Sequence, residues 1–271
     1  MNAETIRKAK QEEIGMDSVD HYVTLEENHE LSKSLKSSHA FADVVVEARF
    51  SPEEREMFAR IIRQFNTLYW EAAMQTWQIT DWRGVPVLKP PTDMWIYQEL
   101  ITKIKPTVII ETGTWAGGSA LFMRDVMKLN NQEGTIITID ITEERFHPLF
   151  KDILQASLGE DELQQILWMN GRSISEEVVE AVKCCIDPSD RVMVILDSDH
   201  SYENVSKELE CYAPLVTKGS VLVIEDTSNC PDALRAVQDW YFENRGAFKM
   251  DVTCEKFMLT FSRDGFYERI V

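Results

Sequence analysis

Short apolar runs alternate with helical patterns through the second half of the chain. Between the runs, apolar residues recur at helical spacing, for example from Val205 to Leu215, and Gly219 closes that pattern. Apolar strands that alternate with helices are typical of βαβ units and a parallel sheet. The sequence therefore predicts an α/β fold, with helices on both faces of a mostly parallel sheet. The predicted strands cover residues 107–111, 135–140, 166–170, 192–197 and 220–226.

The end of the chain follows a different pattern. Two strand-like runs, Phe248–Val252 and Lys256–Phe261, are separated by only a short link. A link this short leaves no room for a crossover helix, so the two strands have to run antiparallel. We expect an antiparallel hairpin at the edge of the sheet.

The first part of the chain is helical or irregular. Ser51-Pro52-Glu53-Glu54 has the cap, proline and first-turn acids of a helix start, and apolar residues follow at helical spacing. A second helix is expected over Thr92–Lys103, after the break at Lys89-Pro90-Pro91. Residues 1 to about 40 are polar, which indicates a loosely held arm or short helices. We divide the chain into an N-terminal arm and helical segment, 1–80, and one domain, 81–271.

Composition and charge narrow the classes of partner. The chain has 271 residues, 44% of them hydrophobic, which suits one α/β domain with a packed core. Its net charge of −18 disfavours phosphate backbones and anionic lipid surfaces, so we expect neither nucleic acid nor a membrane as partner. No apolar run approaches the ~20 residues of a membrane span. The N-terminus also lacks the apolar region of a secretory signal, and we expect a cytoplasmic protein.

The cysteines suggest no disulfide framework. There are five of them, and their spacing fits neither paired disulfides nor a zinc site. We expect reduced thiols that are buried as small hydrophobic residues, including the adjacent pair Cys184-Cys185.

A glycine-rich turn follows the first predicted strand of the sheet. From Glu111 to Ser119 the chain reads E-T-G-T-W-A-G-G-S, with Gly113 and Gly117 inside the turn. Glycines let a backbone turn tightly and approach a ligand, and the following helix offers its first N–H groups. Trp115 stands where a dinucleotide-binding G-x-G-x-x-G would need its second glycine. The pattern resembles motif I of Rossmann-like methyltransferases that use S-adenosylmethionine.

An acidic residue, Asp140, closes the next strand. A carboxylate at this place can accept hydrogen bonds from both ribose hydroxyls of an adenosyl group. A glycine-rich turn followed by such an acid occurs in many Rossmann-like proteins. The two signals in this order favour S-adenosylmethionine as the cofactor.

Three more carboxylates follow the later strands. Asp197 comes after one apolar strand, and Glu225 and Asp226 come after the next. If the two strands are neighbours, these acids meet at one edge of the sheet. Such a group is costly without a cation, and Mg²⁺ prefers oxygen ligands. We therefore predict Asp197, Glu225 and Asp226 as ligands of Mg²⁺, although an isolated Asp197 would equally suit a helix cap or a solvated loop.

His200 lies three residues after Asp197, near the expected start of a helix. Its imidazole could take the proton of a hydroxyl that the metal acidifies, which would make it a general base. The remaining histidines, His21, His29, His39 and His147, have no partner pattern and are interpreted as structural or surface residues.

These motifs resemble a known family, the cephalosporin-hydroxylase-type family of class I S-adenosylmethionine-dependent methyltransferases. This family includes rhamnosyl and macrolide-sugar O-methyltransferases. The likeness extends from about Trp82 to the C-terminus. The segments that carry it read K-P-P-T-D from Lys89, Y-Q-E from Tyr97, I-E-T-G from Ile110, G-G-S from Gly117, I-D at Ile139, G-R-S from Gly171, L-D-S-D-H from Leu196, Y-A-P-L from Tyr212 and V-I-E-D from Val223.

The resemblance implies a role for each matched residue. Glu111, Gly113 and Ser119 would line the cofactor, and Asp140 would hold its ribose. Arg172 and Ser173 would lie near the adenine. The metal and base assignments are those given above, with a segment containing Lys89 and Asp93 over the site. The family also implies a small-molecule or sugar acceptor and a tendency to form homo-oligomers.

Three other functions compete with methyl transfer. A non-haem iron hydroxylase would need two histidines and a carboxylate, and no histidine here has an acid two residues later. A nicotinamide oxidoreductase is disfavoured by Trp115 in the glycine turn. A non-catalytic S-adenosylmethionine-binding module would have no need of Asp197, His200, Glu225 and Asp226 together. We therefore predict Mg²⁺-dependent methyl transfer to a hydroxyl.

Overall fold

The computed structural model describes residues 51–71, 76–141 and 165–271. All of these belong to one compact unit of the chain. The expected N-terminal arm and the histidines at positions 21, 29, 39 and 147 lie outside the described residues. Among the described helices, none combines the length and the apolar character needed to cross a bilayer.

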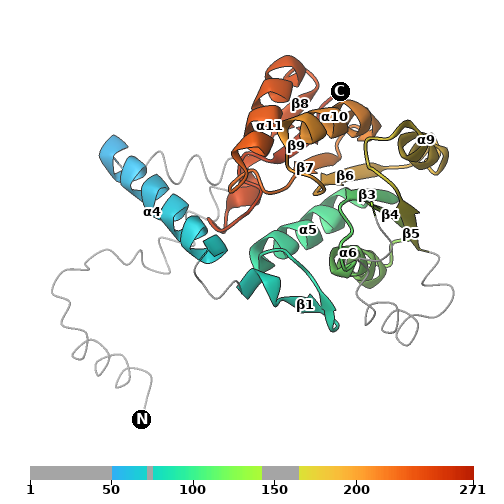
Figure 1. The fold of residues 1–271 in the computed structure, drawn as a ribbon, viewed down its shortest axis with the longest axis horizontal. Coiled ribbons are helices and arrows are strands. Elements are labelled where there is room, and N and C mark those ends of the chain that lie inside the picture. Colours follow the sequence, from blue (N-terminus) through green and yellow to red (C-terminus); the bar gives the residue numbers. More distant parts are fainter. Residues whose placement is uncertain (1–50, 72–75, 142–164) are drawn as a thin grey trace, which may run out of the picture. The chain divides into compact units, whose positions relative to one another are not determined.

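A seven-stranded sheet forms the centre of the unit (Figure 1). Its first five strands in spatial order are parallel, and the last two are antiparallel additions at the edge. This confirms the predicted α/β class with a mostly parallel sheet. The spatial order is β5 (Ile166–Asn170), β4 (Thr135–Asp140), β3 (Val108–Thr112), β6 (Val192–Leu196), β7 (Val221–Ile224), β9 (Phe266–Arg269) and β8 (Phe248–Met250).

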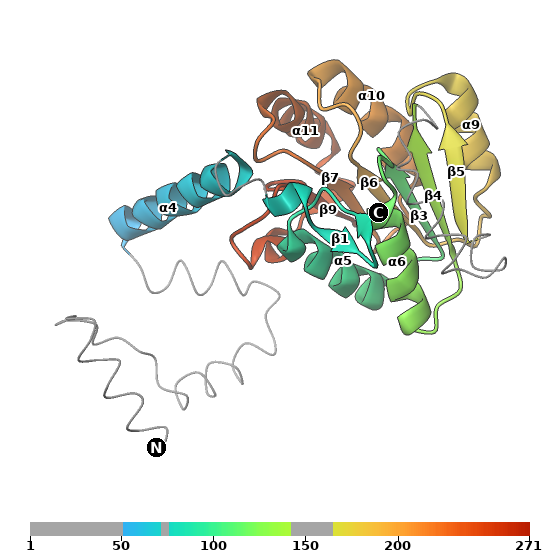
Figure 2. The same ribbon diagram turned by 60° about the horizontal axis from the view of Figure 1, so that its bottom comes forward.

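Helices cover both faces of this sheet, as Figures 1 and 2 show. One face packs against α5 (Pro91–Ile104) and α6 (Gly118–Leu129), and the other against α9 (Glu176–Cys184), α10 (Tyr202–Tyr212) and α11 (Pro231–Asn244). Successive residues of β3 serve the two cores in turn, because side chains alternate along a strand. Ile109 packs with α5 and α6, whereas Val108 and Ile110 pack with the other helices. Both faces of the strand are buried, and this explains why the strand has a continuous apolar sequence.

The predicted C-terminal hairpin is partly wrong. β8 falls within the first predicted strand and is antiparallel to β9, but β9 lies at Phe266–Arg269 and not at 256–261. The chain after β8 instead forms a short 3₁₀ helix, Val252–Glu255, which the side chain of Asp251 caps. Phe261 packs against Trp70 and Trp77. The last residue of the predicted strand thus belongs to an aromatic cluster and not to the sheet.

The predicted first helix is confirmed as α4 (Pro52–Glu71). Ser51 and Glu54 cap its start reciprocally: the N–H of Glu54 donates to Ser51 Oγ, and the N–H of Ser51 donates to Glu54 Oε2. Near its end, Asn66 donates to the carbonyl of Met258 and accepts from the N–H of Thr260. The predicted boundary after residue 80 stays a prediction.

The remaining small elements complete the chain between these helices and strands. Thr76–Gln78 and Ala213–Leu215 are 3₁₀ helices, and β1 (Asp81–Trp82) pairs with β2 (Val85–Pro86). The expectation that the cysteines are buried was wrong for most of them. Cys254 is buried, but Cys184 and Cys185 are exposed.

Candidate active site

A cavity of about 750 Å³ opens at the carboxyl ends of β3, β4, β6 and β7. The ladder of backbone hydrogen bonds extends beyond the strand ends and fixes the loops there. The N–H of Gly113 donates to the carbonyl of Ile139, and the N–H of Asp197 donates to that of Thr112. The cavity is lined by Trp70, Trp77, Leu88, Gly113, Trp115, Ile139, Asp140, Ile141, Gly171, Arg172, Ser173, Asp197, Ser198, Asp199, His200, Asn204 and Asp226.

Gly113 is where two of these loops touch. Its φ of +86° lies in the left-handed region, and a Cβ at this position would lie 1.8 Å from the carbonyl oxygen of Asp197. The glycine was predicted for the close approach of a ligand. The structure shows that it also permits the close approach of the backbone that carries Asp197.

Four of the predicted cofactor residues share the cavity: Gly113, Asp140, Arg172 and Ser173. Asp140 accepts a hydrogen bond of 2.8 Å at Oδ2 from the N–H of Trp115. This bond ties the glycine turn to the end of β4, and Asp140 is only half-buried. Its second oxygen is therefore in a position to accept from a ligand.

The other three predicted cofactor residues support the turn from behind. Glu111 is fully buried; Ser119 Oγ donates to its Oε1 and Thr138 Oγ1 donates to its Oε2 at 2.8 Å. Burial raises the pKa of Glu111 to about 7, against the opposing influence of Lys89. Gly117 has a φ of +84° and precedes α6 as its N-cap. None of these side chains lines the cavity in this structure.

Two of the three predicted metal ligands, Asp197 and Glu225, are joined by Lys89. Its ammonium lies between Asp197 and Glu225, with Nζ 2.6 Å from Glu225 Oε1 and in contact with Asp197 Oδ2. The hydroxyl of Tyr97 donates to the same Oε1 of Glu225. Asp197 and Asp226 line the cavity, whereas Glu225 lies behind its wall and is 2% exposed.

Lys89 and its acids perturb one another. Burial acts to lower the pKa of Lys89. The negative charges of Asp197 and Glu225 outweigh this effect, so the pKa is raised and the ammonium stays charged. Burial alone would raise the pKa of Asp197, yet Lys89 and His200 hold it below its ordinary value. Burial, followed by the charge of Asp197, raises the pKa of Glu225 to about 8 and that of Asp226 to about 6.

His200 faces two of the acids. Its Nε2 lies 3.3 Å from Asp226 Oδ2 and 3.5 Å from Asp197 Oδ1. Burial disfavours its charged form, but Asp197 and then Asp226 raise its pKa to about 9. The same nitrogen is buried and makes no hydrogen bond. His200 is also the one histidine in the described part of the chain, so no two-histidine iron site is assembled there.

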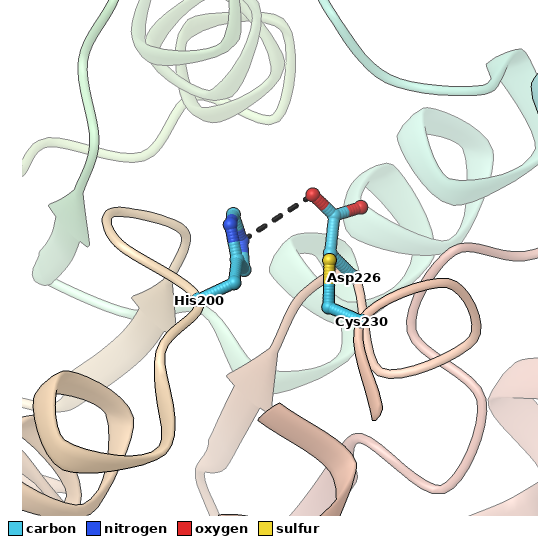
Figure 3. Close-up of side chains that lie close together, drawn as sticks. All are labelled: His200, Asp226 and Cys230. Carbon is cyan, nitrogen blue, oxygen red and sulfur yellow. Dashed lines mark ion pairs between the residues drawn. The ribbon is translucent and has the colours of Figure 1, made fainter. Parts of the chain in front are cut away.

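Figure 3 shows the thiol of Cys230 near His200 and Asp226. Cys230, at the N-terminus of α11, joins His200 and Asp226 in a group whose potential ligand atoms all lie within 4.8 Å of one another. The sequence offered no spacing signal for this group, because the three residues come from two separate strand ends.

Sequence reasoning also missed an aromatic wall. Trp70 and Trp77 stack with ring centroids 4.5 Å apart, and both line the cavity. The indole N–H of Trp77 donates to the carbonyl of Trp70, which fixes the pair. Both residues precede the recognisable motifs, and only the fold brings them to the strand ends.

Comparisons with known proteins identify the family of this chain. Residues 74–270 match the family model described as Rhamnosyl O-methyltransferase/CmcI. A rhamnosyl O-methyltransferase of Mycobacterium leprae is 32% identical over 211 residues, which cover 74% of this chain and 87% of that protein. A rhamnosyl O-methyltransferase of Mycobacterium bovis is 29% identical over 160 residues, covering 59% of this chain and 61% of the relative.

A solved structure also shares the fold. The structure described as cmcI-D160 Mg-SAM superposes on this chain with a TM-score of 0.54 and 20% sequence identity. The match covers 72% of this chain and 78% of that one. This likeness confirms the predicted fold class and nothing beyond the fold.

Proposed function

The chain belongs to the rhamnosyl O-methyltransferase/CmcI family, and from this premise we propose that it methylates a sugar hydroxyl with S-adenosylmethionine and a divalent cation. Membership confirms the predicted family and the predicted class of enzyme, an O-methyltransferase. The observation that carries the proposal is the convergence of Asp140, Asp197, His200 and Asp226 on one cavity.

The cavity fits the cofactor. Its volume of about 750 Å³ lies within the usual range for small-molecule sites. Asp140 would bind the ribose hydroxyls through the oxygen that Trp115 leaves free. Arg172 and Ser173 line the part of the cavity beside it and would contact the base. Glu111 and Ser119 would act indirectly, by holding the glycine turn in place.

The acidic group fits a divalent cation as well. Lys89 and Tyr97 both contact Oε1 of Glu225, and Lys89 contacts only Oδ2 of Asp197. Each of these acids therefore keeps a second oxygen, and Asp226 faces the cavity beside them. Oxygen ligands of this kind are what Mg²⁺ prefers. Asp197, Glu225 and Asp226 would hold the ion, with Lys89 balancing the remaining charge.

When bound, S-adenosylmethionine supplies the methyl group on its sulfonium, and the cation supplies positive charge that makes an acceptor hydroxyl more acidic. His200 would take the hydroxyl proton at Nε2. Without a cation, Asp197 and Asp226 keep His200 protonated, since its pKa is about 9. If a bound cation neutralised these two acids, the pKa of His200 would fall and its imidazole could act as a base at neutral pH.

The aromatic wall supports a sugar acceptor. Trp70 and Trp77 present flat apolar rings beside polar residues, which suits a sugar with its apolar face on the rings and its hydroxyls toward Asp226. We expect Trp70→Ala to raise the acceptor KM on the order of 3- to 10-fold, the scale of one lost aromatic contact, with little change in cofactor affinity. Trp95→Ala is the matched control, because Trp95 is 57% exposed and does not line this cavity.

Methyl transfer from labelled S-adenosylmethionine to rhamnosyl glycosides, with Mg²⁺ or with EDTA, tests the proposal. Asp197→Asn should lose most activity and its dependence on the cation while it still binds the cofactor. Asp187→Asn is the control, because Asp187 is an exposed acid that does not line this cavity. Full activity of Asp197→Asn would refute the metal assignment. Cofactor binding without transfer to any sugar would favour the non-catalytic alternative.

A further inference from the structure

Cys230 gives the acidic site a ligand of a different chemical kind. Asp226 and Cys230 are joined by a tight turn, in which the N–H of Cys230 donates to the carbonyl of Asp226 at 2.7 Å. Figure 3 shows the Asp226 carboxylate facing His200, with the Cys230 sulfur beside the Asp226 side chain. Three different ligand types, a carboxylate, an imidazole and a thiol, thus lie together, and the first two line the cavity.

The distances suit a small metal ion. Zinc binds nitrogen and oxygen at about 2.0–2.2 Å and sulfur at about 2.3 Å, so neighbouring ligands of a tetrahedral site lie roughly 3.3–3.8 Å apart. His200 Nε2 and Asp226 Oδ2 already lie 3.3 Å apart, and the Cys230 sulfur lies within 4.8 Å of a ring nitrogen of His200 and a carboxylate oxygen of Asp226.

A second observation concerns Nε2 of His200, the nitrogen that faces the group. This buried atom forms ion pairs with Asp226 and Asp197 but no hydrogen bond of good geometry. Most buried polar atoms in proteins do form a hydrogen bond. A metal ion would satisfy this nitrogen, and Asp197 Oδ1, 3.5 Å from it, offers a further oxygen beside the group.

We propose that His200, Asp226 and Cys230 form a binding site for a borderline or soft divalent cation, of which Zn²⁺ is the type. Thiolate and imidazole select such ions, whereas Mg²⁺ selects oxygen. Asp226 would be a ligand both of Mg²⁺ and of this second ion, so the two ions compete for its carboxylate. Insofar as this rests on the proposed function, an ion on His200 also removes the general base, so Zn²⁺ inhibits methyl transfer.

Cobalt titration tests the site directly, because Co²⁺ replaces Zn²⁺ and a cobalt–thiolate bond absorbs in the near ultraviolet. Cys184 and Cys185 are exposed and adjacent, so both are replaced by serine in every protein compared. In this background we expect one Co²⁺ per chain with a thiolate band. Cys230→Ser should lose the band and bind Co²⁺ at least about tenfold more weakly. Cys254→Ser, which removes the buried cysteine, should keep both.

Alkylation of the unsubstituted protein provides a measurement that does not depend on the folding of a variant. Zn²⁺ should slow the modification of Cys230, read by peptide mass, and leave that of the similarly half-buried Cys211 unchanged. Absence of the band, or a band that survives Cys230→Ser, would overturn the site, as would equal protection of both thiols. These readouts need neither cofactor nor acceptor. If the protein binds Co²⁺ as expected but transfers no methyl group, the proposed function is refuted and the metal site is not.

Discussion

Lys89 places its ammonium nitrogen 2.6 Å from Oε1 of Glu225, although the two residues are 136 positions apart in the chain. The pair is almost fully buried and is shared with Asp197 on the other side. A buried charge of this kind stabilises its partners only while the set is complete. Lys89 therefore links the segment before α5 to the ends of β6 and β7, and it sets how much charge a bound cation has to balance.

Replacement of Lys89 by methionine should destabilise the protein. Removing one partner of a buried ion pair costs about 3–5 kcal/mol, because the other charge stays buried and unpaired. Excess Mg²⁺ should restore part of this loss, since the ion can take over the neutralisation of Asp197 and Glu225. Urea unfolding with Mg²⁺ and with EDTA measures both effects.

Lys256→Met is the control for that experiment. Lys256 pairs with Glu99 at the surface, and such pairs contribute only about 0–1 kcal/mol. Equal unfolding free energies for the two lysine variants would contradict the structural role assigned to Lys89.

Substitution at Gly113 should be far more damaging than at another glycine with positive φ. In Gly113→Ala the new methyl would meet the carbonyl oxygen of Asp197 at 1.8 Å, and relief requires the end of β6 to move. We expect a loss of about 3 kcal/mol or more in the free energy of unfolding, together with loss of cation-dependent activity.

Gly219→Ala separates backbone strain from this clash. Gly219 has a φ of +76°, but a Cβ there would meet nothing within 4 Å. Its loss should be limited to the left-handed backbone cost of about 1–2 kcal/mol. Thermal and urea unfolding compare the two, and indistinguishable variants would show that the approach of Gly113 to Asp197 is unimportant.

His200→Ala should reduce turnover by ~10²–10⁴, the usual scale for loss of a general base, with little change in cofactor affinity. The pKa of His200, about 9 without a cation, should also fall when Mg²⁺ binds, because the ion neutralises Asp197 and Asp226. NMR titration of the imidazole with and without Mg²⁺ measures this shift. An unchanged turnover in the alanine variant would remove His200 from the mechanism.

Asp93 should make stability fall as pH rises. Burial raises its pKa to about 7, although its Oδ2 accepts from the N–H of Phe261. An acid whose folded pKa exceeds its unfolded value near 4 binds more protons in the folded state. Stability therefore declines between the two values, by up to about 1.4 kcal/mol per pH unit, and is constant above the folded pKa.

Asp93→Asn removes that titration and can still accept from Phe261. Measured by urea unfolding from about pH 5.5 to about pH 8, the variant should gain on the unsubstituted protein up to about pH 7. Asp187→Asn is the control: hydrogen bonds from Ser189 hold the pKa of Asp187 below its ordinary value, so it is ionised throughout. A difference between Asp93→Asn and the unsubstituted protein that does not vary with pH would refute the assignment.

The part of the site that lies at the ends of the parallel strands could be predicted from the sequence. Asp197, Glu225 and Asp226 could be grouped in advance because parallel strands end at one edge of a sheet, and Asp140 and Gly113 followed from the same rule. The misplaced last strand shows the limit of that approach. Phe261 has the local pattern of a strand residue, and its contacts with Trp70 and Trp77 depend on packing that no local pattern contains.

The rest of the site depends on side chains that arrive from distant segments. The segment of Lys89 was expected over the site, but nothing in its pattern indicated that the ammonium enters between two carboxylates. The roles of Trp70 and Trp77 follow from the stacking of two rings that belong to no motif. Cys230 looked like one of five unremarkable thiols until the loop after β7 placed it beside His200.

Calorimetric titration of S-adenosylmethionine into the purified protein, with Mg²⁺ and with EDTA, tests the central claim most directly. The account predicts micromolar binding, about −8 kcal/mol, at one site per chain. It also predicts affinity at least about tenfold weaker in Asp140→Ala, a change of about 1.4 kcal/mol. Absence of binding under both conditions, or full affinity in Asp140→Ala, would contradict the assignment of this cavity to the cofactor.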